Sequence, residues 1–220
     1  MKRFSLMLLV CSTLALLSYT TAKKKKVIFF GDSITAAGVQ PEGYISQMKH
    51  KDGAESYELI GAGIGGNKVY DLYLRMEEDV LAKKPDIVVI YIGVNDVWHK
   101  TSSGTGTDYD KFGKFYRALI KKLQAQKAKV ILCTPAVIGE KKDGGNAQDA
   151  DLDKYSAGIR EIAAELKLPL VDLRKLFIEY NAAHNPENKE KGILTSDGVH
   201  LNKEGNAQVA ATMWEAIRTL

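Results

Sequence analysis

The chain alternates between short, continuous apolar runs and longer segments in which apolar residues recur every three or four positions. Continuous apolar runs are typical of strands that a parallel sheet buries on both faces. The Asp86–Ile92 run, DIVVIYI, gives the strongest signal of this kind. In all, the pattern predicts five strands, at Val27–Phe30, Tyr57–Ile60, Asp86–Ile92, Lys129–Cys133 and Leu170–Val171.

The segments between the strands have the spacing of amphipathic helices, and we interpret their apolar stripes as faces packed on the core. The stripes are Val69, Leu72, Tyr73, Met76 and Val80; Phe112, Phe115, Tyr116, Leu119 and Leu123; Ile159, Ile162, Ala163 and Leu166; and Ala207, Ala210, Ala211, Trp214 and Ile217. Alternating strands and helices predict an α/β fold, in which helices cover both faces of a parallel sheet. Ligands of such sheets bind outside the carboxyl ends of the strands.

Three segments with candidate chemistry directly follow predicted strands: GDSIT the first, GIGGN the second and GVND the third. GIGGN lacks both the GxGxxG spacing and the lysine of a P-loop, which argues against a bound nucleotide. Two longer polar loops, Lys100–Asp108 and Gly139–Asp149, also follow predicted strands. We expect both loops to rim the ligand cleft.

The amino-terminal segment has the features of a secretory signal. Lys2 and Arg3 precede a mostly apolar stretch, Phe4–Tyr19, and small residues follow as far as Ala22. A membrane anchor is the alternative, but the stretch is short and interrupted by polar residues. We therefore predict a signal peptide at 1–22, a secreted or periplasmic protein, and no stable membrane insertion once the signal is removed.

Length and composition favour a single globular domain at 23–220, since the chain has 220 residues, of which 45% are hydrophobic and 26% charged. The net charge of +4 depends on basic residues close to the amino terminus, so we expect no nucleic-acid partner. Removal of the signal would take away Cys11 and leave Cys133 alone. We therefore expect no intrachain disulfide, and a buried strand position for Cys133.

Ser33 of GDSIT is the candidate nucleophile. A serine hydroxyl is weakly nucleophilic at neutral pH, so it needs a nearby base and donors for the oxyanion that forms after attack. We expect Ser33 to lie where a buried strand turns into a loop, with its hydroxyl accessible at the carboxyl edge of the sheet. The GDS triplet alone is also an ordinary turn or helix cap.

Candidate partners for this serine occur further along the chain. Asp197 and His200 lie three positions apart before the last predicted helix, where the carboxylate could hold Nδ1–H and leave Nε2 free for the serine proton. The alternative is a capping aspartate beside an incidental histidine. Gly66 offers an unobstructed backbone N–H, and Asn95 a side-chain amide. A flexible loop and an Asx turn are the alternatives for these two residues.

Together these residues resemble the conserved blocks of the SGNH, or GDSL, hydrolase superfamily, from the first predicted strand to the carboxyl terminus. Ser33 matches the serine block, Gly66 the glycine block, Asn95 the asparagine block, and Asp197 and His200 the final pair. The resemblance implies a flavodoxin-like, three-layer α/β/α fold and an acyl-enzyme mechanism of ester hydrolysis. It implies that Ser33 attacks, that His200 and Asp197 complete a triad, and that Ser33, Gly66 and Asn95 hold the oxyanion. It also implies that no metal or organic cofactor is needed.

Five neighbouring residues are secondary candidates. We interpret Asp32 as structural, holding the turn, although some members of the superfamily use this residue to shape the cleft. Asn67 and Asp96 are expected to fix the loops that carry the oxyanion donors. Trp98 and His99 follow GVND and are candidates for contact with substrate. The alternative for His99 is an incidental exposed histidine.

The resemblance implies the reaction but not the ester. Predicted export, short polar cleft loops and the absence of an apolar lid favour a short acyl group. The segments GYISQMK and TSDGVHLNKEGNAQVA are similar to bacterial acetylesterases that act on glycans. We therefore expect an acetyl ester on a carbohydrate. The alternatives are a lysophospholipase or broad short-chain lipase or arylesterase, a non-catalytic glycan-binding domain, and a flavin-binding carrier; no oligomeric state is predicted.

Overall fold

Five parallel strands form the sheet of the computed structural model, which describes residues 23–220. Along the sheet the strand order is β2-β1-β3-β4-β5, the flavodoxin-like order, which confirms the predicted α/β fold. The predicted signal peptide at 1–22 lies outside the described residues. The strands are β1 (Lys25–Gly31), β2 (Tyr57–Gly63), β3 (Ile87–Tyr91), β4 (Lys129–Cys133) and β5 (Leu170–Val171).

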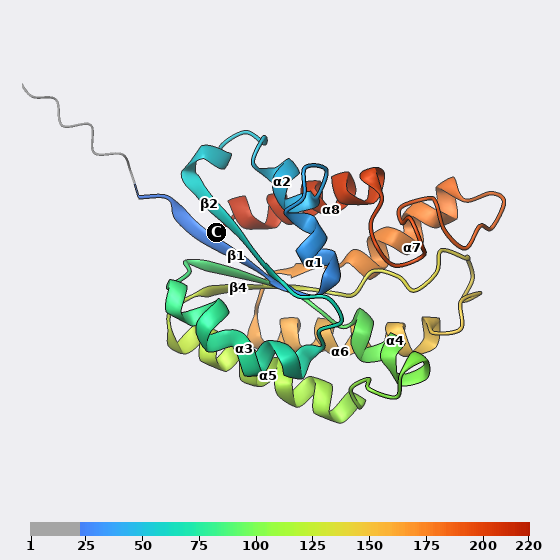
Figure 1. Cartoon of the computed structure of the whole chain (residues 1–220), viewed down its shortest axis with the longest axis horizontal. Helices are drawn as coiled ribbons and strands as arrows, with labels where there is room; N and C mark the ends of the chain where they lie inside the picture. The colour runs from blue at the N-terminus through green and yellow to red at the C-terminus, as the bar shows by residue number, and fades with distance from the viewer. Residues whose placement is uncertain (1–22) are drawn as a thin grey trace, which may run out of the picture.

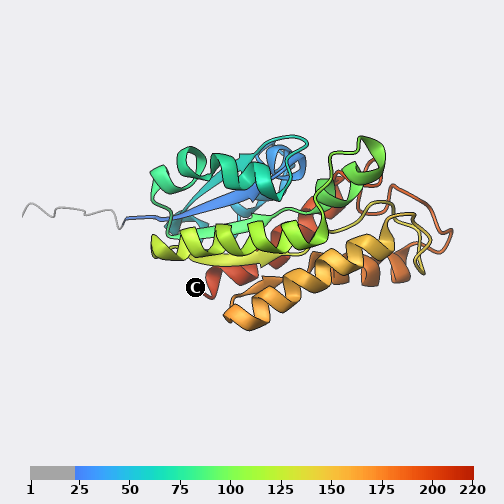
Figure 2. The same cartoon turned by 90° about the horizontal axis from the view of Figure 1, so that it is seen from below.

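Helices cover both faces of the sheet (Figure 1). One face carries α1 (Ser33–Gly38), α2 (Tyr44–Met48) and α8 (Lys203–Arg218). The other carries α3 (Val69–Asp79), α5 (Tyr109–Ala125) and α6 (Asp149–Leu166), which lie side by side in Figure 2. The remaining helices are α4 (Val94–Ser102), α7 (Leu173–His184) and the 3-10 turns Ala54–Ser56 and Leu81–Lys83. None of the helices within residues 23–220 combines the length and apolarity needed to cross a membrane.

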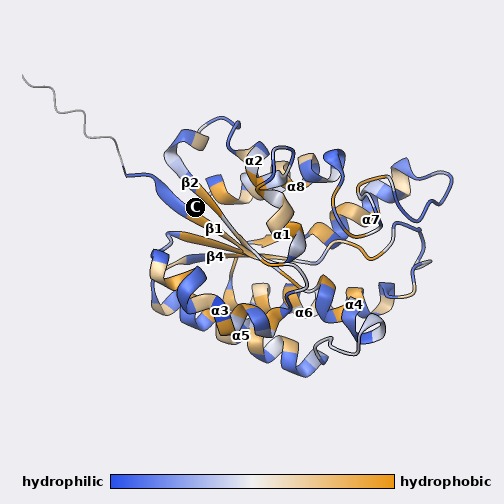
Figure 3. Cartoon of the chain, viewed as in Figure 1, coloured by the Kyte–Doolittle hydropathy of each residue, from blue (hydrophilic) through white to orange (hydrophobic). Residues whose placement is uncertain are grey.

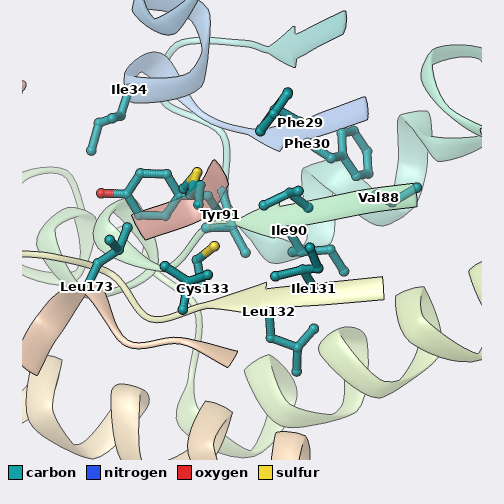
Figure 4. Close-up of a cluster of buried hydrophobic side chains, with 14 of the residues drawn as sticks. Phe29, Phe30, Ile34, Val88, Ile90, Tyr91, Ile131, Leu132, Cys133 and Leu173 are labelled. Carbon is teal, nitrogen blue, oxygen red and sulfur yellow. The ribbon is translucent and has the colours of Figure 1, made fainter. Parts of the chain in front are cut away.

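The hydrophobic core lies between the sheet and the two helix layers. Successive strand residues point to opposite faces, so strands covered on both faces bury every side chain, as all five residues of β3 do. Figure 3 shows apolar strands between helices whose outer surfaces are hydrophilic. Figure 4 shows Phe29 and Phe30 packed near Ile90 and Ile131, with Cys133 in the same cluster. Cys133 is fully buried, as predicted, and burial raises the pKa of its thiol.

The register of the strands aligns their carboxyl ends at one edge. Gly31 is opposite both Gly63 and Tyr91, Tyr91 is opposite Cys133, and Cys133 is opposite Val171. The segments that follow these residues therefore leave the sheet side by side. Because β2 and β3 lie on opposite sides of β1, the topological switch point, where ligands of such sheets bind, lies between β1 and β3 at this edge.

Strand boundaries differ from the sequence prediction at the glycine-rich end of β2. The strand continues past Ile60 to Gly63, because these residues pair with the end of β1. A Cβ at Gly63 would lie 2.1 Å from the backbone nitrogen of Ala36, so only glycine allows β2 to approach α1 this closely. β1 is also longer than predicted, and β3 is one residue shorter at each end.

The apolar pattern does not predict four of the helices, namely α1, α2, α4 and α7. The first two have 6 and 5 residues, too few to show a repeating stripe. Two expectations are wrong as a result. Ser33 begins α1 instead of lying in a loop, and the segment Lys100–Asp108 begins inside α4 instead of following a strand. The Gly139–Asp149 segment is irregular as expected, up to the start of α6.

Candidate active site

Ser33, His200 and Asp197 form a hydrogen-bonded chain beyond the carboxyl ends of the strands. Nε2 of His200 lies 2.9 Å from Oγ of Ser33, and its Nδ1 lies 2.7 Å from Oδ2 of Asp197. The other carboxylate oxygen, Oδ1, accepts the backbone N–H groups of Val199 at 2.9 Å and of His200 at 2.8 Å. The structure thus brings together three residues that are up to 167 positions apart in the sequence.

The hydrogen bonds around Asp197 favour its ionised form. Partial burial raises the pKa of Asp197, but the His200 ring and two backbone N–H groups outweigh this effect and lower it below its ordinary value. An ionised carboxylate can only accept, so Nδ1 of His200 carries the proton in this contact. Nε2 is then free to accept the proton of the Ser33 hydroxyl.

Asp32 fixes the start of α1, at which Ser33 is the first residue. Its Oδ1 accepts the backbone N–H of Ile34 at 3.0 Å, a helix cap that agrees with the structural interpretation of this residue. Asp32 is only 2% exposed, and burial raises its pKa to about 7. Because the first N–H groups of a helix have no intrahelical acceptor, the Ser33 N–H is available to a ligand.

A hydrogen bond connects the loop that carries Gly66 to Asn95, the other candidate oxyanion donor. Gly66 has a φ of +75°, a left-handed conformation that favours glycine. Asn95 lies in the first turn of α4, and its Nδ2 donates to the Asn67 carbonyl at 3.1 Å. A Cβ at Gly65 would lie 3.9 Å from the Ser33 Cβ, so the glycine-rich loop passes close to the serine. The amide of Asn95 keeps a second N–H for a ligand.

Asp96 connects the start of α4 to the start of α3. Its carboxylate oxygens accept the Val69 N–H at 3.1 and 3.3 Å. Asp96 is fully buried, and burial raises its pKa to about 6. Since α3 follows the Gly66 loop directly and α4 carries Asn95, this contact connects the Gly66 loop to the helix that carries Asn95.

Arg75 is a site-supporting residue that the sequence pattern does not reveal. Its Nε donates to Oδ1 of Asn67 at 2.7 Å, and its Nη2 donates to the carbonyls of Gly31 at 2.8 Å and Ala62 at 3.0 Å. Its guanidinium lies 4.6 Å from the centroid of the Phe30 ring. In the sequence Arg75 is an ordinary polar residue of an amphipathic helix, so no local signal marks its role.

Glu140 is a second supporting residue without a sequence signal. It is completely buried, and its carboxylate accepts the N–H groups of Ile193 at 2.8 Å, Leu194 at 2.6 Å and Thr195 at 2.9 Å. These residues begin the loop that carries Asp197 and His200. In the segment GEKKDGGN, however, Glu140 resembles a solvated surface charge, because its neighbours are charged residues and glycines.

Trp98 and His99 are neighbours on α4, and their ring centroids lie 5.9 Å apart. His99 faces the loop that carries Gly66, since its Cε1 lies 3.8 Å from the position that a Cβ on Gly66 would take. Burial and the positive charge of Lys68 lower the pKa of His99, which favours its neutral form. Trp98 is half-buried and lines a hollow beside Asp197. Within residues 23–220, no three His, Cys, Asp or Glu side chains are grouped so that they could hold a metal ion.

Comparisons with known proteins place the chain among ester hydrolases. A model of the GDSL-like Lipase/Acylhydrolase family matches residues 29–208. An acetylxylan esterase of Geobacillus stearothermophilus is 33% identical over 208 residues, covering 84% of this chain and 90% of its own. The crystal structure of an acetyl xylan esterase, AlAXEase, superimposes with a TM-score of 0.86 at 62% identity, covering 87% of this chain and 99% of that one.

Solved structures of a Geobacillus stearothermophilus acetylxylan esterase, Axe2, are also similar. One of them, a catalytic mutant in which a serine is replaced by alanine, has a TM-score of 0.77 at 27% identity and covers 89% of this chain and 94% of its own. Two further catalytic mutants replace a histidine and an aspartate by alanine. The family match extends over most of the described residues, and the resemblance found in the sequence is confirmed. The chain belongs to the GDSL-like lipase/acylhydrolase family and is a carboxylic ester hydrolase.

Proposed function

We propose that this protein is an exported esterase that removes acetyl groups from acetylated xylan or xylooligosaccharides, with Ser33 as its nucleophile. The observation that carries the proposal is the hydrogen-bonded chain from Ser33 through His200 to Asp197, with contacts of 2.9 and 2.7 Å. The xylan part of the proposal is supported by the similarity to acetylxylan esterases across almost their whole length.

In the proposed reaction, Oγ of Ser33 attacks the acetyl carbonyl while Nε2 of His200 accepts its proton. Asp197 stays ionised and stabilises the imidazolium that results. His200 then donates this proton to the sugar oxygen, which leaves as an alcohol and gives an acetyl-enzyme. Water attacks the acetyl-enzyme with His200 again as the base, and acetate leaves as Ser33 regains its proton.

The negative charge that develops on the carbonyl oxygen needs donors already in place. We assign this role to the backbone N–H groups of Ser33 and Gly66 and to Nδ2 of Asn95. The Ser33 N–H is available at the start of α1, and the second N–H of the Asn95 amide is not used by the contact with Asn67. Removal of one such donor in other serine hydrolases lowers kcat by about 10²- to 10³-fold.

The glycines near Ser33 support a small acyl group. Gly65 leaves open the space next to the Ser33 Cβ, where a larger side chain would lie over the nucleophile. A long acyl chain would need an extended apolar pocket to be held out of water. The hollow beside Asp197 is instead lined mostly by polar side chains and glycines, with Trp98, Ile138, Ala147 and Val199 as its apolar members.

The aspartate–histidine spacing also supports the assigned roles. In the catalytic mutants of the Geobacillus enzyme, the replaced aspartate lies three positions before the replaced histidine, the same separation as between Asp197 and His200. For the export of this chain, the support is the basic, apolar and small-residue sequence of 1–22. On this proposal the mature enzyme is a single domain at 23–220.

The proposal is tested by measuring acetate release from acetylated xylan and from other acetylated polysaccharides. We expect release from xylan by the wild type and a loss of about 10⁴-fold or more in kcat in Ser33→Ala. The matched control is Ser56→Ala, an exposed serine before β2, which should keep full activity. A fluorophosphonate probe should label the wild type and the control but not Ser33→Ala.

Acyl-chain preference separates the proposal from its main alternative. With nitrophenyl esters of increasing chain length, we expect the highest kcat/KM for acetate. A preference for chains of about eight carbons or more would instead indicate a lipase or lysophospholipase, because longer chains gain affinity only from apolar burial. Full esterase activity in Ser33→Ala would overturn the assigned nucleophile.

A further inference from the structure

A groove with a volume of about 380 Å³ opens beside Asp197, between α4 and the segment 139–148. These two parts of the chain lie at the right-hand end of the molecule in Figure 1. Trp98 of α4 lines the groove, and Gln148 lines it from the start of α6. Gly198 and Val199, which separate Asp197 from His200, line it as well. We call this feature the Trp98 groove.

The Trp98 groove is built onto the loop that carries His200. The Gly139 N–H donates to the Gly198 carbonyl at 2.7 Å, and the Glu140 N–H donates to the Glu190 carbonyl at 2.8 Å. Nε2 of Gln148 lies 3.4 Å from Oγ1 of Thr101, which joins the wall formed by 139–148 to α4. A molecule in the groove is therefore held beside Asp197 and the two residues that separate it from His200.

The charges along the Trp98 groove compensate one another. Nζ of Lys141 lies 3.3 Å from Oε2 of Glu190, and Asp197 is paired with the His200 ring at 2.7 Å. The groups left to contact a ligand are the side-chain amides, the backbone hydrogen-bonding groups and the partly exposed Trp98. Such a surface suits a neutral ligand that has both hydroxyl groups and apolar ring faces. It suits neither an acyl chain nor an anionic head group.

We propose that the Trp98 groove binds the xylose residues next to the acetylated sugar, with a sugar ring stacked on Trp98 and hydroxyl groups bonded to the Gln148 amide. This proposal rests on the proposed function and adds to it the place where the polysaccharide chain runs. On this arrangement the two neighbouring rings of α4 contact different parts of the substrate. His99 and Gly66 lie on the side of the acetyl group, and Trp98 lies on the side of the glycan.

A second hollow provides an internal comparison. It has a volume of about 440 Å³ and is lined by Lys84, Gln126 and the carboxyl-terminal Leu220 among others. It lies at the amino ends of the strands, since Ile87 and Lys129, the first residues of β3 and β4, also line it. Being at the opposite edge from Ser33, it cannot place a sugar chain near the nucleophile, although it is the larger of the two.

The test uses tryptophan fluorescence in the Ser33→Ala background, which binds without turnover. The chain has 2 tryptophans, and the other one, Trp214, is buried against Tyr57 at 5.2 Å between ring centroids. Titration with xylotetraose should give a saturable change in emission. The change should persist in Ser33→Ala/Trp214→Phe and disappear in Ser33→Ala/Trp98→Phe.

Affinity provides a readout that does not depend on Trp98. By calorimetry, Ser33→Ala/Gln148→Ala should bind xylotetraose about fivefold more weakly, the loss expected for one hydrogen bond. The matched control Ser33→Ala/Gln126→Ala alters an exposed glutamine of the opposite hollow and should leave Kd unchanged. Binding that Gln148→Ala does not weaken, or that Gln126→Ala weakens equally, would overturn the proposal.

The outcomes for the Trp98 groove and for the proposed function can be told apart. If the wild type releases acetate from acetylated xylan but xylotetraose neither binds Ser33→Ala nor changes Trp98 emission, the groove assignment is wrong and the proposed function stands. If the wild type releases acetate only from other esters, the proposed function fails and the groove assignment fails with it.

Discussion

Ser33, Gly66 and Asn95 are positioned by regular secondary structure, whereas Asp197 and His200 are positioned by buried side chains that bind the backbone. Each residue of the first group lies within a few positions of the carboxyl end of a strand, and the strand register aligns those ends. The second group lies between α7 and α8, in a stretch whose only β-pairing within the described residues is an isolated bridge.

The two halves of the candidate site use opposite kinds of anchor. Arg75 supports the strand-borne half by donating to two strand-end carbonyls and to the Asn67 side chain. Glu140 supports the loop-borne half by accepting three backbone N–H groups. A carboxylate can gather the N–H groups of an irregular loop, and a guanidinium can gather carbonyls at the end of a sheet, because each satisfies backbone groups that lack a partner in regular structure.

This difference shows that an irregular loop can hold candidate site residues in a defined geometry when its buried backbone groups have hydrogen-bond partners. It also predicts where the molecule is sensitive. At the strand ends Arg75 adds to the hydrogen bonds of the sheet, whereas in the loop the buried carboxylate of Glu140 accepts three N–H groups, beside contacts from the Thr195 and Asn202 side chains. Removal of the buried anchor should therefore have a larger effect than removal of the partly exposed one.

The largest effect is expected for Glu140→Ala, which leaves three buried N–H groups without an acceptor. We expect a loss on the order of 4 kcal/mol in the free energy of unfolding, measured by urea denaturation. At temperatures where the variant is folded, kcat should fall about a hundredfold with little change in KM, because a displaced His200 affects chemistry more than binding. Glu140→Asp should recover part of both losses.

Glu187→Gln is the matched control for this variant. Glu187 is exposed and pairs with Lys189 at 2.9 Å on the surface, so its removal should change the free energy of unfolding by less than about 1 kcal/mol. If Glu140→Ala were as stable as this control, the loop would not depend on the buried carboxylate, and the contrast between the two halves would be wrong.

The next effect concerns the pH dependence of stability. As the pH rises, the contribution of Asp32 to the free energy of unfolding decreases, whereas that of Asp197 increases. Burial raises the pKa of Asp32 to about 7, so the folded state holds this proton between pH 4 and 7 while the unfolded state has lost it. Its contribution to stability is therefore present at low pH and lost as the pH rises towards 7. Asp32→Asn keeps a capping oxygen but does not titrate. Between pH 4 and pH 8, its free energy of unfolding should rise relative to that of the wild type by on the order of 3 kcal/mol.

Asp197 serves as a control, because its contribution to stability should change with pH in the opposite direction. Hydrogen bonds lower its pKa despite partial burial, so its contribution is present at neutral pH and lost on acidification. The stability of wild type relative to Asp197→Asn should therefore decrease as the pH falls below 5. Equal pH profiles for the two variants, measured by denaturant titration at each pH, would show that the two carboxyl groups do not differ in environment.

The smallest of these effects is expected for Arg75→Ala. Its side chain is 16% exposed, so water can reach part of the network, and we expect a loss of about 2 kcal/mol in the free energy of unfolding. Since Arg75 binds Asn67, whose carbonyl holds Asn95, kcat should fall by about tenfold through a less well-ordered oxyanion site. Arg75→Lys should not restore kcat, because an ammonium group cannot reproduce the planar fork. If Arg75→Ala lost more free energy of unfolding than Glu140→Ala, the loop would not be the more sensitive half of the site.

The sequence by itself determined the sheet and singled out the candidate reacting residues. Apolar segments located all five strands. The run is continuous in β3, which is buried on both faces, but not in β2 at the sheet edge, where Glu58 is exposed. Ser33, Gly66, Asn95, Asp197 and His200 could be singled out because each follows a strand or precedes the last helix in a short recognisable segment. The short helices α1 and α2 escaped detection because so few residues carry no periodic signal.

Only the tertiary structure decided how these residues are supported and what lies beside them. Glu140 and Arg75 look like surface charges in the sequence, because burial and long-range hydrogen bonds leave no local pattern. The Trp98 groove depends on α4 and the segment 139–148, which meet only when the chain folds. Local sequence reports local periodicity and motif chemistry, whereas anchors and grooves arise from contacts between distant residues, and so they become visible only in the folded molecule.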